Sequence, residues 1–536
     1  MNKIIKSLIS VLLVCLMLMP TGIFAFAEET TDSIITEDEY LATEGEIYPI
    51  VYVIGKVDTI YKVKGDKSSE TVYPPSMDKM DTKVLTEELV PALSDALMGE
   101  LSGDQSAADE SWKEYGEALY KVVISMFQGL ALDENGEASD GSGIAWEWPE
   151  TPLYDTKKGG KYGLYDYTFH YDWRLDMFHN AEILDQYIDE VLEVTGAEKC
   201  VLISRCYGCN LVTTYLSEYG HDAVDNCILY CSTATGSIVC SEIFCGEINV
   251  NAEGLDYYLA DLFGGKNPIK EAIGASRNEL VGQIGTWSVN KILEKVGDDV
   301  IPRVLMETFG TMPGYWSMVD DEHYEAALDF AYGMDLNKWK KYEKLIEKTD
   351  FYHYTVQLRV EELLMEAFND GVRYANITKY GSQLVPVIEG QDFLGDSIVE
   401  VERASLGATA TKTNETFSES YIKNAAYDGF YISPEKQIDA STALIPDCTW
   451  FVKGVDHFSF PECVDELLLA IARYDGQMSI FAYGNFPQYL EFEDDENVLD
   501  YGSDKFLDSN SKLAVILKTV LSYIELIISF ITSIFG

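Results

Sequence analysis

Short apolar runs alternate with amphipathic segments through the first half of the chain. The runs are rich in β-branched and aromatic residues and have the length of buried strands. They lie at 47–54 (IYPIVYVI), 165–173, 200–204 (CVLIS) and 227–231 (CILYC). Between them, apolar residues recur at steps of three and four over 180–195 and 211–219, which predicts helices. This alternation predicts an α/β fold with a mostly parallel central sheet and helices on both faces.

Residues 250–375 interrupt this alternation, because they are mostly helical in spacing and rich in Trp and Tyr. Strands are predicted again at 384–389 (LVPVIE) and 449–453. A helical insertion between two strands of one sheet favours a cap over an independent domain. We therefore expect one domain over 46–500 that includes a helical cap at about 250–375.

The N-terminal segment predicts export, and the C-terminal segment predicts association with a membrane surface. Lys3 and Lys6, an apolar run over 8–19 and the small residues around Ala27 are typical of a signal peptide over 1–27. An acidic leader over 28–45 follows. At the other end, 511–536 predicts an apolar helix with one narrow polar stripe along 513–536, which favours a membrane surface over packing on protein or spanning. The expected location is secreted or extracellular, with the outer face of a membrane as one such place.

Charge and cysteine usage narrow the classes of partner. The chain has 90 acidic and 39 basic residues and a net charge of −51, which excludes nucleic acid as a partner. The C-x-x-C motif at 206–209 is found in both redox sites and zinc sites. No second C-x-x-C accompanies it, which weakens the case for a structural zinc site. We expect no metal site and no cofactor.

The segment 200–210 (CVLISRCYGCN) predicts a strand, a tight turn and a helix, which is the layout of a nucleophile elbow. The small residues Ser204 and Gly208 flank Cys206, which occupies the apex. The following helix N-terminus favours a thiolate, and the N–H of Tyr207 would be one oxyanion donor. The loop after the first strand, at Gly55 or Lys56, would supply the second donor. The competing interpretation is a buried structural cysteine in an inactive elbow.

A thiol nucleophile needs a base and an orienting carboxylate, in the chain order nucleophile, acid, histidine. His457 is the last of six histidines and follows a late strand. Asp392 and Asp396 both follow the strand predicted at 384–389, so position alone leaves the acid open. His323 and His353 fall in the expected cap and are interpreted as structural.

Four segments resemble the lecithin:cholesterol acyltransferase-like branch of α/β-hydrolases over roughly 47–475. Tyr171-Asp172-Trp173-Arg174 matches the branch's Y-D-W-R motif, with matching spacing to the elbow. The other segments are 232–237, 313–316 and 394–399. The resemblance implies that Asp396 is the acid and that the chain hydrolyses esters or transfers acyl groups on lipid-like substrates. This chain departs from the branch at six positions: Cys206 for serine, Arg205 for histidine, Cys209 for glycine, Gly55-Lys56 for Pro-Gly, and Glu400 for proline.

Three functions follow as hypotheses. The first is a secreted ester hydrolase or acyltransferase with Cys206, His457 and Asp396 as its triad and a lipid or small ester as substrate. The second is an inactive binding protein of the same fold at the cell surface, which the altered oxyanion loop and elbow flanks favour. The third is a thiol-redox role for Cys206 and Cys209.

Overall fold

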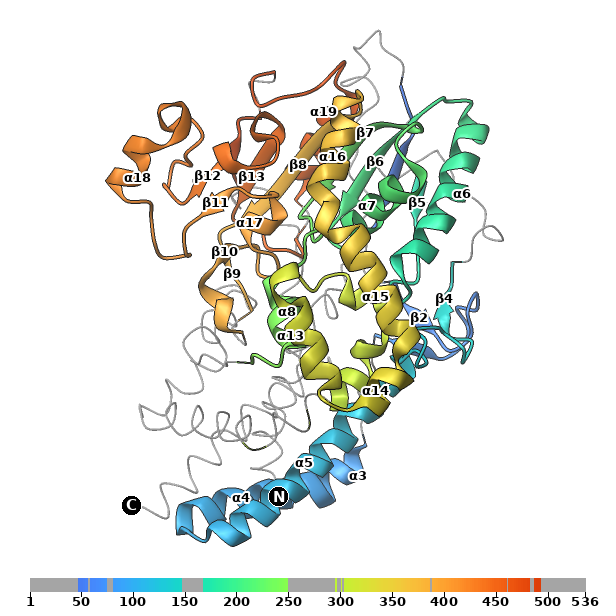
Figure 1. Ribbon diagram of the computed structural model, residues 1–536, viewed down its shortest axis with the longest axis vertical. Coiled ribbons are helices and arrows are strands. Elements are labelled where there is room, and N and C mark those ends of the chain that lie inside the picture. The colour runs from blue at the N-terminus through green and yellow to red at the C-terminus, as the bar shows by residue number, and fades with distance from the viewer. Residues whose placement is uncertain are drawn as a thin grey trace, which may run out of the picture.

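The computed structural model describes residues 47–55, 58–74, 81–146, 167–248, 303–385, 388–459, 461–482 and 486–492, together with Lys295 and Val300. Its centre is a sheet of seven strands in the order β14-β13-β8-β7-β6-β1-β5 (Figure 1), and every neighbouring pair is parallel. The strands are β1 (Ile50–Val53), β5 (Tyr167–Phe169), β6 (Cys200–Arg205), β7 (Val224–Tyr230), β8 (Arg373–Tyr380), β13 (Thr449–Lys453) and β14 (Tyr489–Glu491). The chain therefore has the α/β architecture that the alternation predicted.

Amphipathic helices surround this sheet and bury its apolar side chains. They include α6 (Met177–Thr195), α7 (Gly208–Tyr219), α16 (Val360–Asn369) and α19 (Glu462–Arg473). Helix α7 packs between α6 and α16, and α19 contacts β7. Asp176 caps the first turn of α6 by accepting N–H bonds from Phe178 and His179, and Gly196 ends the helix with φ 70°.

The region between β1 and β5 forms a separate layer. A small antiparallel sheet contains β2 (Ile60–Tyr61), β3 (Thr71–Tyr73) and β4 (Gly143–Ile144). The helices are α3 (Thr82–Val84), a π-helical turn (Leu85–Leu89), α4 (Val90–Ser102) and α5 (Gln105–Phe127). In Figure 1 α4 and α5 lie side by side and extend away from the central sheet.

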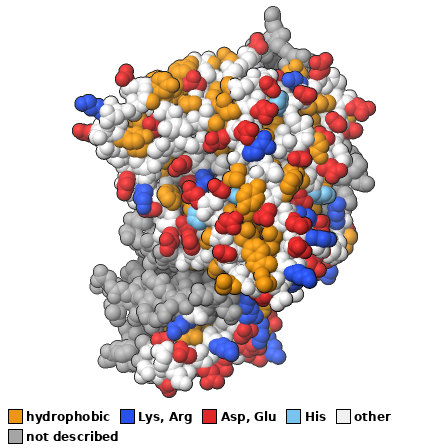
Figure 2. All heavy atoms as spheres, viewed as in Figure 1, with side chains coloured by type: hydrophobic (Ala, Val, Ile, Leu, Met, Phe, Trp, Pro, Cys, Tyr) orange, Lys and Arg blue, Asp and Glu red, His pale blue; other side chains and the backbone are white. Residues whose placement is uncertain are grey.

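Between β7 and β8 the described chain is helical. It contains α8 (Ile238–Phe244), α12 (Pro313–Trp316), α13 (Asp321–Tyr332), α14 (Leu336–Lys341) and α15 (Glu343–Thr355) before α16. The buried ring of Trp316 packs on Phe244, Tyr324 and Tyr332. Figure 2 shows hydrophobic side chains on the outer face of these helices, where Met334, Leu336 and Phe351 are exposed.

The last segments connect the strands that follow. Two short antiparallel pairs, β9 (Ser382–Gln383) with β10 (Leu394–Gly395) and β11 (Thr409–Ala410) with β12 (Ile438–Asp439), lie between β8 and β13. The helices there are α17 (Val401–Ala404) and α18 (Glu419–Asn424).

One predicted strand is wrong. The sheet strand in this region is β8, at Arg373–Tyr380, and not 384–389. Its sequence, RYANITKY, contains polar residues, so it lacks the continuous apolar run that predicts a buried strand. All of its residues except Arg373 are nevertheless buried. Because β8 already begins at Arg373, the helical region ends earlier than the predicted limit of 375, with α16 at Asn369.

Several predicted segments lie outside the described residues: the signal peptide 1–27, the leader 28–45, Lys56 and the tail helix 511–536. Within the described residues, no helix combines the length and the apolar character that crossing a bilayer requires.

Candidate active site

Cys206 lies at a sharp turn between β6 and α7. Its φ of 48° is in the left-handed region, which is unusual for a non-glycine residue. Gly208 begins α7 so close to β1 that a Cβ there would overlap the carbonyl oxygen of Val53. On the other side, a Cβ on Gly55 would lie 2.8 Å from the Cβ of Cys206. The turn therefore needs small residues at both contacts, and it presents Cys206 at the carboxyl edge of the sheet.

Three side chains from distant segments meet at this edge in a hydrogen-bonded line. The Cys206 Sγ lies 3.0 Å from Nε2 of His457, and His457 Nδ1 lies 2.7 Å from Oδ2 of Asp396. The other carboxylate oxygen, Oδ1, accepts the N–H groups of Ile398 and Val399. A second link joins the two residues through the backbone, because the backbone N–H of His457 donates to the backbone carbonyl of Asp396 at 2.7 Å. The structure thus brings the three predicted residues together and fixes the imidazole on both sides.

The charges of this line favour an ion pair. Burial alone lowers the pKa of His457, but the Asp396 and Cys206 charges and their hydrogen bonds outweigh burial and raise that pKa to about 9. Burial alone raises the pKa of Cys206, and the charge and hydrogen bond of His457 together with Arg205 bring it below its usual value. Asp396 likewise has a lowered pKa, because His457 and the Val399 N–H overcome the effect of burial. The resting site is therefore suited to a thiolate beside an imidazolium.

The predicted oxyanion donors are placed in part. Tyr207 follows Cys206 directly, and its N–H contributes to the lowered pKa of the Cys206 thiol. Gly55 touches the elbow, whereas Lys56 lies outside the described residues. The Y-D-W-R motif anchors both sides of this loop: Tyr171 donates its hydroxyl to the Ile54 carbonyl and Trp173 its indole N–H to the Asp58 carbonyl.

Arg174 completes the motif as a buried brace. It pairs with Asp172 at 2.7 Å and also donates to the carbonyl groups of Leu130 and Ser142. The motif therefore ties the loop after β5 to the layer that precedes it.

A buried lysine that the sequence analysis missed lies under the histidine loop. Lys379, on β8, donates its ammonium to the carbonyl oxygens of Asp456, His457 and Ser459 at 3.1, 3.3 and 2.7 Å. Its Nζ also lies 4.7 Å from the centre of the Tyr230 ring. Burial lowers its pKa. A lysine within a buried strand would have indicated such a site in the sequence. The strand that contains Lys379 was not predicted, so this signal could not be used.

One group of ligand-type atoms occurs here: the Cys231 sulfur, an Asp396 carboxylate oxygen and a His457 ring nitrogen lie within 4.8 Å of one another. The charges oppose a dication, because Lys379 and Arg205 act electrostatically on the same cysteine. The hydrogen bond between Asp396 and His457 also occupies the carboxylate. These residues fit an acid–base site better than a metal site.

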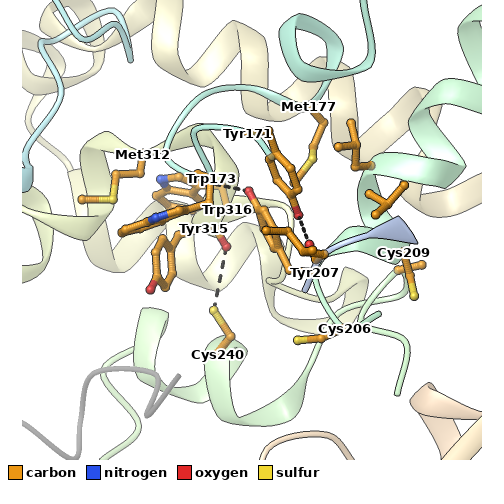
Figure 3. Close-up of a cluster of buried hydrophobic side chains, with 14 of the residues drawn as sticks. Tyr171, Trp173, Met177, Cys206, Tyr207, Cys209, Cys240, Met312, Tyr315 and Trp316 are labelled. Atoms are coloured by element: carbon orange, nitrogen blue, oxygen red, sulfur yellow. Dashed lines mark hydrogen bonds between the residues drawn. The ribbon is translucent and has the colours of Figure 1, made fainter. Parts of the chain in front are cut away.

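Cys206 and Cys209 do not face each other. Cys209 accepts a hydrogen bond from the Ser204 hydroxyl at 3.4 Å, within the packing of α7 on β6, and burial raises its pKa to about 12. Figure 3 shows the two thiol groups directed differently. Ser204, a predicted elbow residue, is thus buried and contacts Cys209 rather than Cys206.

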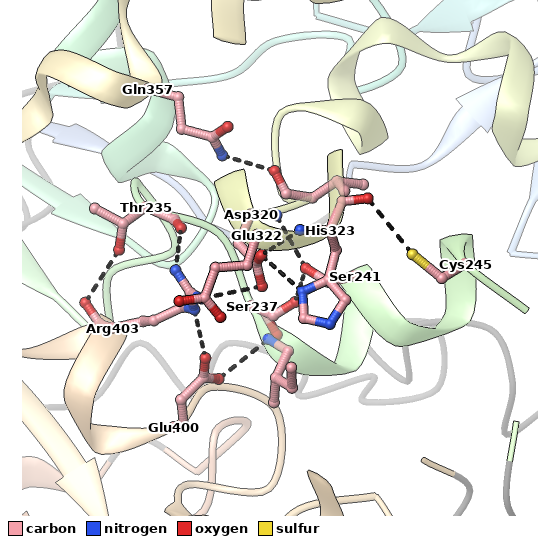
Figure 4. A network of polar contacts seen from close by, with 12 residues as sticks. Thr235, Ser237, Ser241, Cys245, Asp320, Glu322, His323, Gln357, Glu400 and Arg403 are labelled. Carbon is pink, nitrogen blue, oxygen red and sulfur yellow. Dashed lines mark hydrogen bonds and ion pairs between the residues drawn. The ribbon is translucent and has the colours of Figure 1, made fainter. Parts of the chain in front are cut away.

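A second polar network joins the helical region to the segment after Asp396 (Figure 4). Arg403 pairs with Asp320 at 3.2 Å and with Glu400 at 2.8 Å, and it donates to the Thr235 carbonyl. His323 lies 2.8 Å from Asp320, and this hydrogen bond raises its pKa. Burial raises the pKa of Glu400 to about 7 against the opposing charge of Arg403.

The two histidines of this region lie outside the hydrogen-bonded line of Cys206, His457 and Asp396. His323 belongs to the Asp320 network, and His353 is buried and stacks on the Tyr324 ring at 3.9 Å. Asp392, the other candidate acid, pairs with Lys412 at 2.6 Å and is half-exposed.

Comparisons with known proteins leave the family open. No family model matches the chain, and no curated protein matches it. A solved structure titled "The crystal structure of Tle4-Tli4 complex" is similar at 12% identity and a TM-score of 0.23, over 63% of this chain and 75% of that one. Similarity at that level supports no conclusion about fold or function, so the functional argument depends on the site geometry.

Proposed function

We propose that this chain is an exported cysteine hydrolase or acyltransferase of the α/β-hydrolase fold, in the lecithin:cholesterol acyltransferase-like branch. Its proposed substrates are lipid-like or other carboxylic esters. The observation that carries the proposal is the line from Cys206 through His457 to Asp396, which begins at a turn with φ 48° and ends in two backbone N–H groups. A buried structural cysteine needs neither a strained turn nor an imidazole at 3.0 Å.

In the first half of the reaction, the Cys206 thiolate attacks the ester carbonyl carbon and forms a tetrahedral oxyanion. The N–H of Tyr207 and the loop at Gly55 and Lys56 stabilise that oxyanion. The His457 imidazolium then gives its Nε2 proton to the leaving alkoxide, and a thioester on Cys206 remains. Asp396 keeps the imidazole oriented and stabilises its positive charge.

In the second half, neutral His457 removes a proton from water or from an acceptor alcohol. The resulting oxygen nucleophile attacks the thioester, and Cys206 leaves as a thiolate while the imidazole stays protonated. Water as acceptor gives hydrolysis, and an alcohol gives acyl transfer.

The helices between β7 and β8 would act as the cap. They contact the core near the site: the Tyr207 hydroxyl donates to the Trp173 carbonyl, and Gly314 of α12 packs on that same carbonyl and on the Tyr207 hydroxyl. We propose that the Trp- and Tyr-rich side of this cap receives the acyl chain, and that residues 513–536 hold the exported protein at a membrane surface.

The test compares the full-length protein with Cys206→Ala and Cys206→Ser on p-nitrophenyl esters of increasing chain length. Cys209→Ala is the matched control, because it removes a thiol three residues away that faces Ser204. We expect turnover in the parent and in Cys209→Ala, and none in Cys206→Ala. The chain length with the highest rate would begin to define the substrate.

Two other results would separate the alternatives. If the parent is inert and Cys206→Ser turns esters over, the triad and oxyanion site are intact and the native cysteine has silenced a lipase. If the parent and both Cys206 variants are inert while the fold is intact, the proposal is wrong and a cell-surface binding role takes its place.

A further inference from the structure

A second thiol lies beside the proposed nucleophile at the end of the neighbouring strand. Arg205 of β6 and Tyr230 of β7 are register partners, and each is followed directly by a cysteine. The N–H of Cys206 donates to the Tyr230 carbonyl at 2.8 Å, and the N–H of Cys231 donates to the Ile377 carbonyl at 2.9 Å. Cys206 and Cys231 therefore occupy matched positions one step beyond the last paired residues.

The backbone at both positions suits a cross-link. Neighbouring strands lie about 4.8 Å apart, and disulfides join residues whose Cα atoms are roughly 4.4–6.8 Å apart. The φ angles are 48° at Cys206 and 50° at Cys231, so both residues leave their strands in the same left-handed conformation. Two matched residues with the same conformation direct their Cβ atoms to the same side.

Both sulfur atoms also approach one imidazole. The Cys206 Sγ is 3.0 Å from Nε2 of His457, and the Cys231 Sγ is within 4.8 Å of a ring nitrogen of the same residue. One base is thus available to both thiols.

We propose that Cys206 and Cys231 form a reversible disulfide when the protein meets hydrogen peroxide, and that this bond masks the nucleophile. What the bond regulates rests on the proposed hydrolase function, whereas the bond itself does not. Export would expose the pair to oxidants that a cytosolic thiol seldom meets.

The steps balance with peroxide as the oxidant. The Cys206 thiolate attacks one peroxide oxygen, the O–O bond breaks, and the imidazolium of His457 protonates the departing hydroxide to water. Neutral His457 then takes the proton of the Cys231 thiol, whose sulfur attacks the sulfenic sulfur of Cys206. The S–O bond breaks, and hydroxide leaves with that proton as a second water. Two thiols lose two electrons to one peroxide, and a dithiol restores them by exchange.

Other nearby thiols are placed less favourably. Cys209 is held against Ser204 in α7, and Cys240 donates towards the Tyr315 carbonyl at 3.8 Å (Figure 3). Burial raises the pKa of both thiols, as it does that of Cys231, so the pKa does not separate the three. Cys231 differs in that its sulfur lies within 4.8 Å of the His457 ring nitrogen. Neither Cys209 nor Cys240 shares the strand-end register with Cys206.

The test treats the folded full-length protein with hydrogen peroxide, blocks the remaining thiols by alkylation, and maps disulfide-linked peptides by mass spectrometry. The variants are Cys231→Ser and, as the matched control, Cys209→Ser. We expect a linked Cys206–Cys231 peptide in the parent and in Cys209→Ser, lost on treatment with dithiothreitol. In Cys231→Ser we expect Cys206 to proceed to sulfinic acid. A Cys206–Cys209 link, or sulfinic acid at Cys206 in the parent with Cys231 unlinked, would overturn the proposal.

This readout does not depend on turnover, so it separates the two proposals. If esters are hydrolysed, peroxide should abolish the activity of the parent and dithiothreitol should restore nearly all of it. In Cys231→Ser the loss should be permanent. If the disulfide forms but no ester is turned over, the cross-link stands and the hydrolase proposal fails.

Discussion

Replacing Asp396 with Asn tests the ion pair between Cys206 and His457. Asn keeps an oxygen for the N–H groups of Ile398 and Val399, but its amide would face Nδ1 of His457 where the carboxylate now accepts at 2.7 Å. The imidazole would then carry its proton on Nε2 and could no longer accept one from the thiol.

The expected size of the effect follows from the pKa of His457. That pKa is raised from 6.5 to about 9 by Asp396 and Cys206 against the effect of burial. One pKa unit corresponds to about 1.4 kcal/mol, so the net stabilisation of the imidazolium is about 3.5 kcal/mol. The partners together contribute more than this net value, because burial opposes them. Asp396 makes the largest favourable contribution. We expect its loss to lower the thiolate population at neutral pH by roughly 30- to 300-fold.

The assay is the alkylation rate of Cys206 by iodoacetamide from pH 5 to pH 10, followed by the mass of its peptide. The parent should react through the neutral range, since the ion pair persists between the lowered pKa of Cys206 and the pKa of about 9 of His457. The Asp396→Asn profile should shift to alkaline pH. Asp392→Asn is the control, because Asp392 pairs with Lys412 at the surface and should leave the profile unchanged. Superimposable profiles for the parent and Asp396→Asn would refute the ion pair.

Three further substitutions test the surroundings of the site. Lys379→Met should lower the free energy of unfolding in urea by several kcal/mol, because it leaves one buried and two partly buried carbonyl groups without their donor. Lys453→Met, which breaks two partly exposed ion pairs, should cost about 1 kcal/mol or less, and equal losses would contradict this. Glu400 has its pKa raised to about 7, so its contribution to stability falls as the pH rises from about 4.5 through 7. The free energy of unfolding of Glu400→Gln should therefore rise relative to that of the parent as the pH goes from 5 to 8, by up to about 3 kcal/mol as measured by calorimetry. A difference that stays constant with pH would count against the shift. Gly208→Ala should lower the urea midpoint of unfolding and slow the alkylation of Cys206, because the alanine Cβ would overlap the Val53 carbonyl oxygen. An unchanged midpoint would show that the turn tolerates a side chain.

The elbow could be predicted because its pattern is local. Cys200 to Ile203 is a continuous apolar run, and Gly208 marks the helix start, so the strand, the turn and the first residues of the helix all lie within 200–210. The late strand at Thr449–Lys453 was predicted at its exact limits for the same reason. These two elements alone predict that Cys206 and His457 lie at one edge of the sheet.

The strand that adjoins both could not be predicted in the same way. In β8, the buried residues Asn376 and Lys379 donate hydrogen bonds to carbonyl groups of distant segments. Asn376 donates to Ala404 at the end of α17, and Lys379 donates to the His457 loop. No local pattern reports such partners, because they are more than twenty residues away along the chain. Choosing Asp396 over Asp392 also needed more than spacing, and the resemblance supplied it. The catalytic roles of these residues remain predictions that the assays above test.

The reactive thiol is a product of long-range assembly. Cys206 and His457 are 251 positions apart, and His457 and Asp396 are 61 apart. Their contact forms only when β13 has joined the sheet beside β8. Before that step, Cys206 has neither the imidazole nor the carboxylate that make it acidic, and it behaves as an ordinary thiol. In a chain that is still being synthesised, or that crosses a membrane unfolded, the Cys206 thiol therefore keeps its ordinary low reactivity until β13 has joined the sheet.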